Sequence, residues 1–461
     1  MTALEFDCRS AGRSLGFGMA TRRRIVLSLI GVVAGLLAVL ILLIPMLFRL
    51  DRYRPEVISY FEENTGKTVE IGRLALRIFP KLTIHMEGFG VKSPPVFPPS
   101  YIVKVASADA EIDPRALLQR KLVIRSLVLE DVEINLISDP DGPWNFENPR
   151  TINAKNTFPL GNIDKVVMKR GHLIASNLLP SDAAGPVFLE AHDMASELDG
   201  VDLAAIVNPS APALSGHGSW SASRLRFGAV EATHVKSKFR LESREVFLTG
   251  IRADAFDGKA TGDFSVNLAK NTASFKADAQ LSGISMDQLL AAFHEARSRI
   301  TGKLEGDLKL AGEVEHTRNP LAGMHGAGHV RVTDGEVPSL RLNANLMKLL
   351  HFNDLGPAKE NPASFASIST DLELVNLRIL SKTIDIDGYG VDVDGSGSVS
   401  ISGSDELNYQ GVAAITTKQG FFTSTFARLE GAKLKDGKLS FPFRIEGTID
   451  NPKFSKGTKD N

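Results

Sequence analysis

Two short stretches carry residues that enzymes use, and each lacks a companion that the chemistry needs. Ser219 lies in Gly216-His217-Gly218-Ser219-Trp220, but the glycine that closes a nucleophile elbow is absent. Gly66-Lys67-Thr68 ends like a phosphate-binding loop, but Phe61 stands where the loop requires its first glycine. The sequence therefore predicts neither a serine nucleophile nor a nucleotide-binding cradle.

The candidates for metal binding are equally incomplete. His294-Glu295 begins like the helix of a zinc protease, but Ser298 replaces the second histidine. The densest carboxylate cluster has neither calcium-loop spacing nor the terminal glutamate of such a loop, and its Asp-Gly pairs fit hairpin turns. This cluster comprises Asp385, Asp387, Asp392 and Asp394, and single histidines are scattered at His85, His217, His325 and His329. We expect no metal site, no cofactor and no enzymatic activity.

Composition limits the partners and the covalent chemistry. The 461 residues include 53 lysines and arginines against 54 aspartates and glutamates. Because the formal charge is only -1 and no basic run is interleaved with aromatic residues, nucleic acid is not an expected partner. The one cysteine, Cys8, precedes the long apolar run described below, so the chain after that run contains no thiols for disulfides or thiolate metal sites.

An uncharged run at residues 25–48 predicts a membrane anchor. At about 1.5 Å per residue it forms a helix of about 36 Å, long enough to cross a hydrocarbon core of about 30 Å. Arg9, Arg13 and the triplet Arg22-Arg23-Arg24 outnumber the arginines that follow the run. The positive-inside rule therefore predicts a cytoplasmic N-terminus and a body on the other side of the membrane. We further expect that Met19 is the initiator.

After the anchor, most of the chain predicts strands. From Thr68 onward, apolar and polar residues alternate, as at Val69 and Ile71, so that one face of a sheet is apolar and the other polar. Helical patterns interrupt at residues 54–65, 114–118, 286–293 and 342–350. Asp-Gly pairs, which favour tight hairpin turns, begin at Asp199, Asp257, Asp334, Asp387, Asp394 and Asp436. Periodicity alone leaves open whether the sheet closes into a sandwich or barrel or curls into a trough.

Several motifs in order resemble one known family. The N-terminal motifs are the Pro55-Glu56-Val57 helix, Thr65–Gly72, Phe79–Leu82, Asp113–Leu118 and Asp141–Asn145, and the C-terminal ones are Gly328–Val337, Ser367–Thr417 and Phe441–Pro452. Together they resemble the AsmA family, membrane-anchored periplasmic proteins of bacteria with two membranes. One departure is Trp144-Asn145, where the family often has asparagine before tryptophan.

The resemblance implies a fold and a function. AsmA-like proteins resemble the bridge-like lipid-transfer proteins, whose curled sheet has an apolar inner face. We therefore expect a mainly β fold with a few short helices, in which a transmembrane helix precedes an elongated, curled antiparallel β-sheet that forms a hydrophobic groove. The implied protein is anchored in the inner membrane with a periplasmic body, and it shields lipid, with phospholipid as the expected cargo, between the inner and outer membranes. Its expected partners are membrane lipid and an envelope protein near the outer membrane.

The strands nearest the anchor are the expected groove wall, because a lipid leaving the bilayer would first meet them. The expected groove residues are Val69, Ile71, Leu74, Leu76, Ile78, Leu82, Ile84, Val132, Ile134 and Leu136. The expected regions are a cytoplasmic segment at 1–24, the transmembrane helix at 25–48, an AsmA-like N-terminal region at 49–160, a β-rich middle at 161–325, an AsmA-like C-terminal region at 326–452 and a polar tail at 453–461.

A second function from a different class stays open at this point. The family resemblance also implies a non-enzymatic assembly factor that regulates the targeting or assembly of outer-membrane proteins by contact. Whether an apolar ligand accompanies the body after Arg49 distinguishes the two functions.

Overall fold

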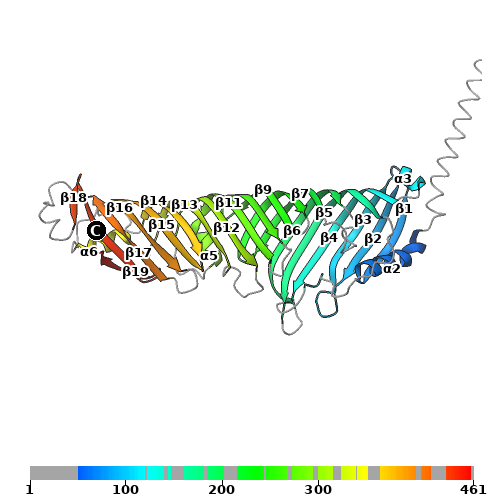
Figure 1. The fold of residues 1–461 in the computed structure, drawn as a ribbon, viewed down its shortest axis with the longest axis horizontal. Coiled ribbons are helices and arrows are strands. Elements are labelled where there is room, and N and C mark those ends of the chain that lie inside the picture. Colours follow the sequence, from blue (N-terminus) through cyan, green and yellow to red (C-terminus); the bar gives the residue numbers. More distant parts are fainter. Residues whose placement is uncertain are drawn as a thin grey trace, which may run out of the picture.

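One elongated sheet makes up nearly all of the structure, a computed structural model (Figure 1). The structure describes residues 50–119, 122–139, 144–146, 160–179, 184–201, 215–242, 245–267, 273–293, 300–314, 323–338, 340–350, 364–400, 406–416 and 432–457. Within them, 20 strands follow one another along the long axis, from β1 at one end to β19 at the other (Figure 1). The mainly β fold predicted from the alternation is confirmed.

The elements are bounded as follows. The strands are β1 (Val69–Arg77), β2 (Thr83–Lys92), β3 (Tyr101–Ile112), β4 (Leu122–Ser138), β5 (Leu160–Leu178), β6 (Ala184–Val201), β7 (Ser215–Phe227), β8 (Val230–Glu242), β9 (Glu245–Ala255), β10 (Gly258–Asn267), β11 (Ala273–Ser285), β12 (Lys303–Val314), β13 (His325–Glu336), β14 (Ser364–Val375), β15 (Arg378–Gly388), β16 (Val391–Ser400), β17 (Glu406–Thr416), β18 (Lys433–Lys435), β19 (Lys438–Thr448) and β20 (Pro452–Lys456). The helices are η1 (Leu50–Tyr53), α2 (Arg54–Thr65), α3 (Pro114–Leu118), α5 (Met286–Phe293) and α6 (Leu342–Leu349). The four helices after η1 lie where the sequence predicts them.

Each strand from β1 to β16 pairs with the next, and every one of these pairs except β4–β5 is antiparallel. The β4–β5 pair is parallel, with Leu122 opposite Leu160, which corrects the expectation of a wholly antiparallel sheet. The chain reverses after β4, where Ser138 forms an antiparallel bridge with Trp144, and β5 then starts beside the beginning of β4. At the far end, β19 pairs with β17 along one edge and with β18 and β20 along the other.

The expected membrane helix at residues 25–48 lies outside the described residues. Among the residues that the structure describes, no helix is both long enough and apolar enough to cross a membrane.

Residues with left-handed backbone angles recur inside the strands. They lie on β2, β4, β5, β6, β8, β9, β11 and β13, at Gly88, Asp131, Arg170, Asp193, His234, Gly250, Gly283 and Asp334. Such residues are typical of β-bulges, which bend a strand and increase its twist. Register shifts accompany several of them, including the one between Leu281 and Ile284 around Gly283. Because the bend recurs from strand to strand, the whole sheet curls along its length.

Among the Asp-Gly pairs, the left-handed backbone conformation occurs both in turns between strands and in a bulge within a strand. Asp257-Gly258 and Asp436-Gly437 join neighbouring strands, as the sequence predicts. The expectation is wrong for Asp334 and Asp394, which lie within β13 and β16, and for Asp199 within β6. At Asp334, φ is 52°, so the aspartate tolerates a left-handed bulge instead of a turn.

Polar side chains from the N-terminal helices cover the free edge of β1. Asp51 Oδ1 accepts a hydrogen bond from the Leu74 amide at 3.3 Å, and Glu62 Oε1 accepts one from the Val69 amide at 3.1 Å. Arg54 Nη1 donates to the Gly72 carbonyl at 2.6 Å. These bonds satisfy an edge that would otherwise offer unpaired backbone groups to another strand. They also tie η1 and α2 to the first strand of the sheet.

We predict that the bulges contribute to stability through backbone conformation. Gly250 has a φ of 61°, and a Cβ there would have no atom within 4 Å, so Gly250→Ala adds strain without a clash. The expected cost is about 1 to 2 kcal/mol, measured as a lower Tm in thermal denaturation. Gly216→Ala is the matched control, because Gly216 lacks a left-handed φ and a Cβ there would meet only the Asp199 carbonyl at 3.9 Å. Equal Tm values for the two variants would contradict the role of the bulge.

Candidate functional site

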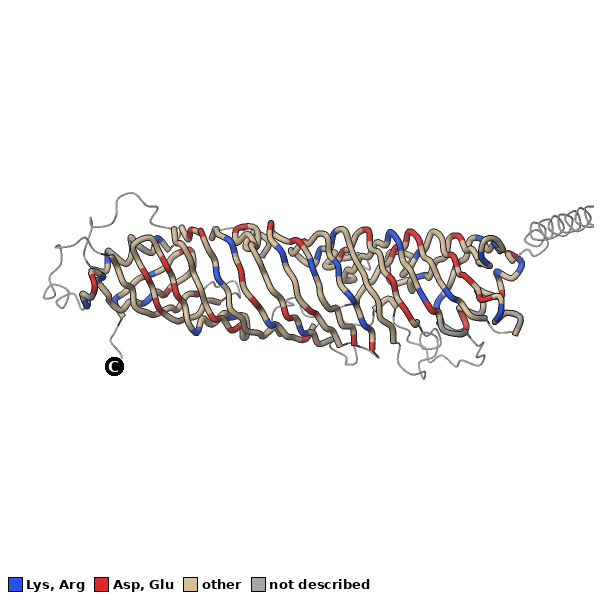
Figure 2. Tube along the Cα trace, turned by 90° about the horizontal axis from the view of Figure 1, so that it is seen from above, with Lys and Arg blue, Asp and Glu red and all other residues tan. Residues whose placement is uncertain are grey.

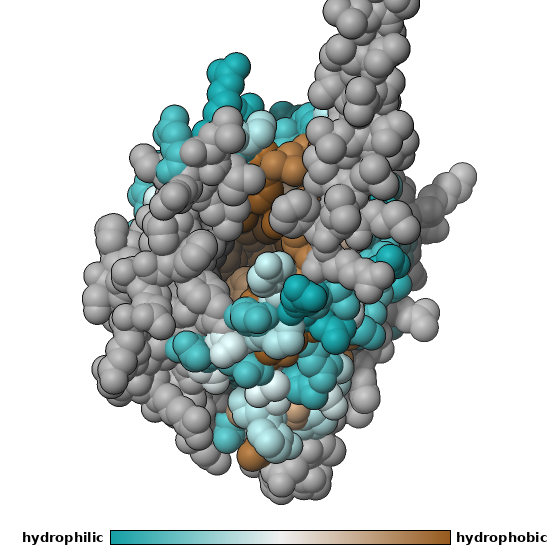
Figure 3. Space-filling view, turned by 90° about the vertical axis from the view of Figure 1, so that its right-hand side faces the viewer, coloured by the Kyte–Doolittle hydropathy of each residue, from teal (hydrophilic) through white to brown (hydrophobic). Residues whose placement is uncertain are grey.

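Pairing across the sheet places apolar side chains in rows on one face. Near the N-terminal end one row runs through Leu74, Met86, Ala108, Leu129 and Met168. In the middle a row runs through Phe239, Leu248, Phe264, Ala277 and Leu310. Near the C-terminal end another runs through Ile368, Ile386, Val393, Ala413 and Phe441. We call this side of the sheet the inner face. Viewed from the N-terminal end, hydrophobic residues line a hollow surrounded by hydrophilic ones (Figure 3).

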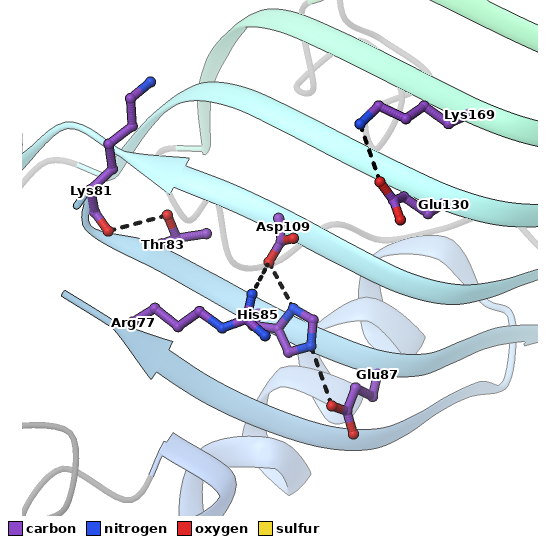
Figure 4. A network of polar contacts seen from close by, with 8 residues as sticks. All are labelled: Arg77, Lys81, Thr83, His85, Glu87, Asp109, Glu130 and Lys169. Carbon is purple, nitrogen blue, oxygen red and sulfur yellow. Dashed lines mark hydrogen bonds and ion pairs between the residues drawn. The ribbon is translucent and has the colours of Figure 1, made fainter. Parts of the chain in front are cut away.

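The opposite, outer face carries polar and charged side chains. Lysines, arginines, aspartates and glutamates occur along the whole length of the sheet (Figure 2). At the N-terminal end, His85 Nδ1 lies 2.7 Å from Asp109 Oδ1 and its Nε2 lies 3.3 Å from Glu87 Oε1 (Figure 4). Arg170 and then Lys169 lower the pKa of the Glu130 carboxyl by hydrogen bonding to its charged form. The outer face is therefore suited to contact with water, and the inner face is suited to contact with apolar molecules.

Helix α2 covers the inner face of β1 at the N-terminal end. Its Val57, Ile58 and Phe61 pack against a buried cluster on β1, and the Phe61 ring meets Phe89 of β2 edge-on at 6.1 Å between centroids. The expected groove residues Val69, Ile71 and Leu74 form that buried cluster. The structure thus brings these three together beneath the helix.

The other expected groove residues occupy three settings. Leu76 and Ile84 are cross-strand partners, both partly buried, and Ile84 packs at the edge of the cluster beneath α2. Ile78 and Leu82 lie in the connection between β1 and β2. On β4, Val132 is buried against Val105 and Ala108, Ile134 packs beside it, and Leu136 follows on the same face opposite Ala175.

Helix α6 closes the C-terminal end. Leu346 is 0 % exposed and Leu350 is 1 % exposed, and both belong to a core cluster with Phe365, Val393 and Ala413 of the sheet. Met286 and Leu289 of α5 pack against the same cluster. This end of the inner face is therefore a closed core.

Between these ends, no helix that the structure describes covers the strip of the inner face on β8 to β10. Phe239, Leu248, Phe264, Phe275 and Leu310 remain partly exposed, and none belongs to a buried core cluster of the described residues. The rings of Phe264 and Phe275 stack at 6.1 Å between centroids. Apolar side chains left partly uncovered in a continuous strip are typical of a surface that receives an apolar ligand. We take this strip, lined by β8 to β12, as the candidate site.

Two polar groups on the inner face differ in their partners. Tyr409 and Ser381 share a hydrogen bond of 3.1 Å between their hydroxyls, and burial raises the pKa of the Tyr409 phenol. Trp220 of β7, which lies between Ser196 and Ser237, has a buried indole nitrogen with no hydrogen-bond partner among the described residues. The sequence analysis did not single out Trp220 as a groove residue. The alternation of Gly218, Trp220 and Ala222 could have indicated that the Trp220 side chain lies on one face of β7 with these two small residues.

The residues considered for chemistry do not assemble into a catalytic group within the described part of the chain. Ser219 lies opposite Glu197 and Lys238 on neighbouring strands. Asp385 faces Asp394, and Asp387 faces Asp392, across the β15–β16 ladder. His294 lies outside the described residues. The absence of enzymatic activity stays a prediction.

Comparison with known proteins bears on the N-terminal third of the chain. Residues 19–162 match the model of the AsmA family. This segment includes α2 and strands β1 to β4. These elements form the N-terminal end of the inner face. A comparison with curated proteins found no match.

We predict that leucines at the closed end and in the open strip differ in their contribution to stability. Leu346→Ala leaves a cavity in a closed core and should cost about 2 to 5 kcal/mol. Leu248→Ala removes a side chain that is already partly exposed, so it should cost much less. Thermal denaturation of the two variants measures the difference. If Leu248→Ala lowers Tm as much as Leu346→Ala does, the middle of the inner face is a closed core and not an open groove.

Proposed function

We propose that this protein, a member of the AsmA family by the match of residues 19–162, shields phospholipid in its groove during transport between the inner and outer membranes. The observation that carries the proposal is the inner face itself, whose apolar rows continue from β1 to β19 and are uncovered in the middle. The family match supports a role in the cell envelope. No covalent step is part of this function.

The energetic need for a groove is large. Each CH₂ group exposed to water costs about 0.8 kcal/mol, so two acyl tails of about 16 carbons face on the order of 20 kcal/mol when they leave a bilayer. A continuous apolar surface removes most of that barrier, because each tail remains in contact with aliphatic and aromatic side chains. The charged outer face allows the same sheet to stand in water.

The size of the sheet supports a path between membranes. Its 20 strands, spaced by about 4.8 Å, give a body of about 90 Å along the pairing direction. We propose that the anchor at residues 25–48 holds the α2 end at the inner membrane, where lipid would first meet Leu76 and Ile84 beside the helix. The far end, at β19, would then face the outer membrane or an envelope protein that completes the path.

Trp220 provides a direct test of lipid entry. The chain has 2 tryptophans, so in a Trp144→Phe background Trp220 is the one indole reporter. Phospholipids with brominated acyl chains quench tryptophan on contact, and we expect them to quench Trp220 while unbrominated lipids do not. The matched control carries Trp144→Phe, Trp220→Phe and Phe247→Trp, so that its one indole lies on the outer face, where position 247 stands opposite Arg240.

The outcomes separate the two candidate functions. Quenching of Trp220 but not of the indole introduced by Phe247→Trp would support acyl chains in the groove. Equal quenching of both indoles would indicate nonspecific contact with lipid, and no quenching of a folded protein would remove the lipid proposal and favour the assembly factor.

We also predict the topology. A reporter that is active only in the periplasm, fused after Asn461, should be active, because the arginine balance around residues 25–48 favours a cytoplasmic N-terminus. The same fusion with Arg22, Arg23 and Arg24 changed to aspartate is the comparison, and it should lose activity if those charges set the orientation. A folded but inactive fusion of the unaltered chain would be evidence for the opposite topology.

A further inference from the structure

A histidine–glutamate–histidine cluster lies on the outer face, away from the groove. His172 comes from β5, and Glu190 and His192 come from β6. Their ligand atoms all lie within 4.8 Å of one another, and among the residues that the structure describes this is the one group of three or more such side chains with that geometry. Glu190 Oε1 lies 3.0 Å from His192 Nε2 and 3.6 Å from His172 Nε2.

Irregular pairing between β5 and β6 creates this arrangement. The register shifts before His172, between Met168 and Gly171, and again across His172, between Gly171 and Leu173. Arg170 and Asp193, the residues at these bulges, have φ values of 53° and 47°. As a result, the two imidazoles stack at 4.5 Å between centroids with an angle of 22° between their planes. Both imidazoles therefore lie beside the same carboxylate oxygen, Glu190 Oε1, and compete for it as a hydrogen-bond acceptor.

The hydrogen bonding of the cluster is incomplete without a further group. His172 Nε2 is buried from solvent and has no hydrogen-bond partner in the described part of the chain. Arg226 of β7 binds the other oxygen of Glu190 at 2.5 Å, which leaves Oε1 directed at the histidines. A buried polar atom without a partner is costly, and a cation bound between the three side chains would satisfy it.

We propose that His172, Glu190 and His192 bind one Zn²⁺ ion. Two imidazole nitrogens and one carboxylate oxygen are a common set of protein ligands for zinc, and a water molecule would complete the tetrahedron. Arg226 would orient Glu190 from behind, as outer partners of metal-binding carboxylates do. The ion would join β5 to β6 where their backbone ladder is irregular, one strand after the parallel β4–β5 pair. Its role is structural, and it does not depend on lipid transport.

The surrounding charges are compatible with a bound cation. The second nearby arginine, Arg224, is paired with Glu231 at 2.5 Å, so its charge is largely compensated. Glu133 of β4 lies opposite His172 in the parallel ladder and adds a negative charge on that side. Other outer-face histidines that the structure describes do not form such a group. His85 lies between Asp109 and Glu87, but the ligand atoms of these three residues do not all lie within 4.8 Å of one another. His234 has Asp254 at 3.1 Å as its one carboxylate, and no second histidine joins that pair.

Zinc titration of the full chain, purified without a polyhistidine tag, tests the proposal. We expect the unaltered protein to bind one equivalent of Zn²⁺ by isothermal titration calorimetry and to gain thermal stability from it. His172→Ala and His192→Ala should each lose the equivalent and the gain in Tm. Glu190→Gln, which keeps a hydrogen-bonding oxygen but loses the charge, should bind zinc more weakly than the unaltered protein. His234→Ala is the matched control and should bind like the unaltered protein.

Two results would overturn the zinc site. One is an unaltered protein that takes up no zinc in the titration. The other is an equivalent of zinc that persists in both His172→Ala and His192→Ala. The metal-free Tm of every variant is measured alongside, and the double variant His172→Gln/His192→Gln, which keeps side-chain polarity, repeats the test if an alanine variant fails to fold. Neither result bears on the quenching of Trp220, so the two proposals fail independently.

Discussion

A sheet with one apolar face cannot leave that face in water, and the rest of this structure follows from how the chain meets that constraint. Alternation along each strand separates apolar from polar side chains, and pairing in register extends the separation across 20 strands. Left-handed residues such as Asp131, Arg170 and Gly250 then bend the strands, so the sheet curls around its apolar side. A single chain thereby forms a long trough in which consecutive strands pair antiparallel, except for the parallel β4–β5 pair.

The two ends and the middle meet the constraint differently. At the ends, short amphipathic helices cover the inner face: α2 lies over Val69 and Leu74, and α6 buries Leu346 completely. In the middle, Leu248 and Phe264 have no such cover among the described residues. The ends therefore supply the packing that stabilises the fold, and the open strip is free to exchange an apolar ligand. Lipid as that ligand is consistent with the AsmA match of residues 19–162.

Much of this could be read from the sequence, because strand alternation and helix capping are local signals. The four helices after η1 appear where the pattern predicts them, and α2 ends at Gly66, which has the left-handed φ of a helix cap. The errors have a common physical cause. Aspartate before glycine tolerates a left-handed angle in a turn and in a bulge alike, as at Asp334, and the same pair also occurs in regular strand backbone, as at Asp394, so neither could be assigned to a strand from the pair alone. The parallel β4–β5 pair and the meeting of His172 with His192 depend on register across a bulge, which no local pattern encodes.

The central claim, that the inner face holds lipid and the outer face does not, is tested most directly at two adjacent residues. Leu248 lies on the inner face between Phe239 and Phe264, and Phe247 lies on the outer face beneath Arg240, whose guanidinium carbon is 4.7 Å from the ring centroid. A benzophenone amino acid is placed at either position in the full chain, the cells are irradiated, and covalent adducts are identified by mass spectrometry. The account predicts phospholipid adducts at position 248 and none at position 247. Adducts of equal yield at both positions, or protein adducts alone at position 248, would contradict it.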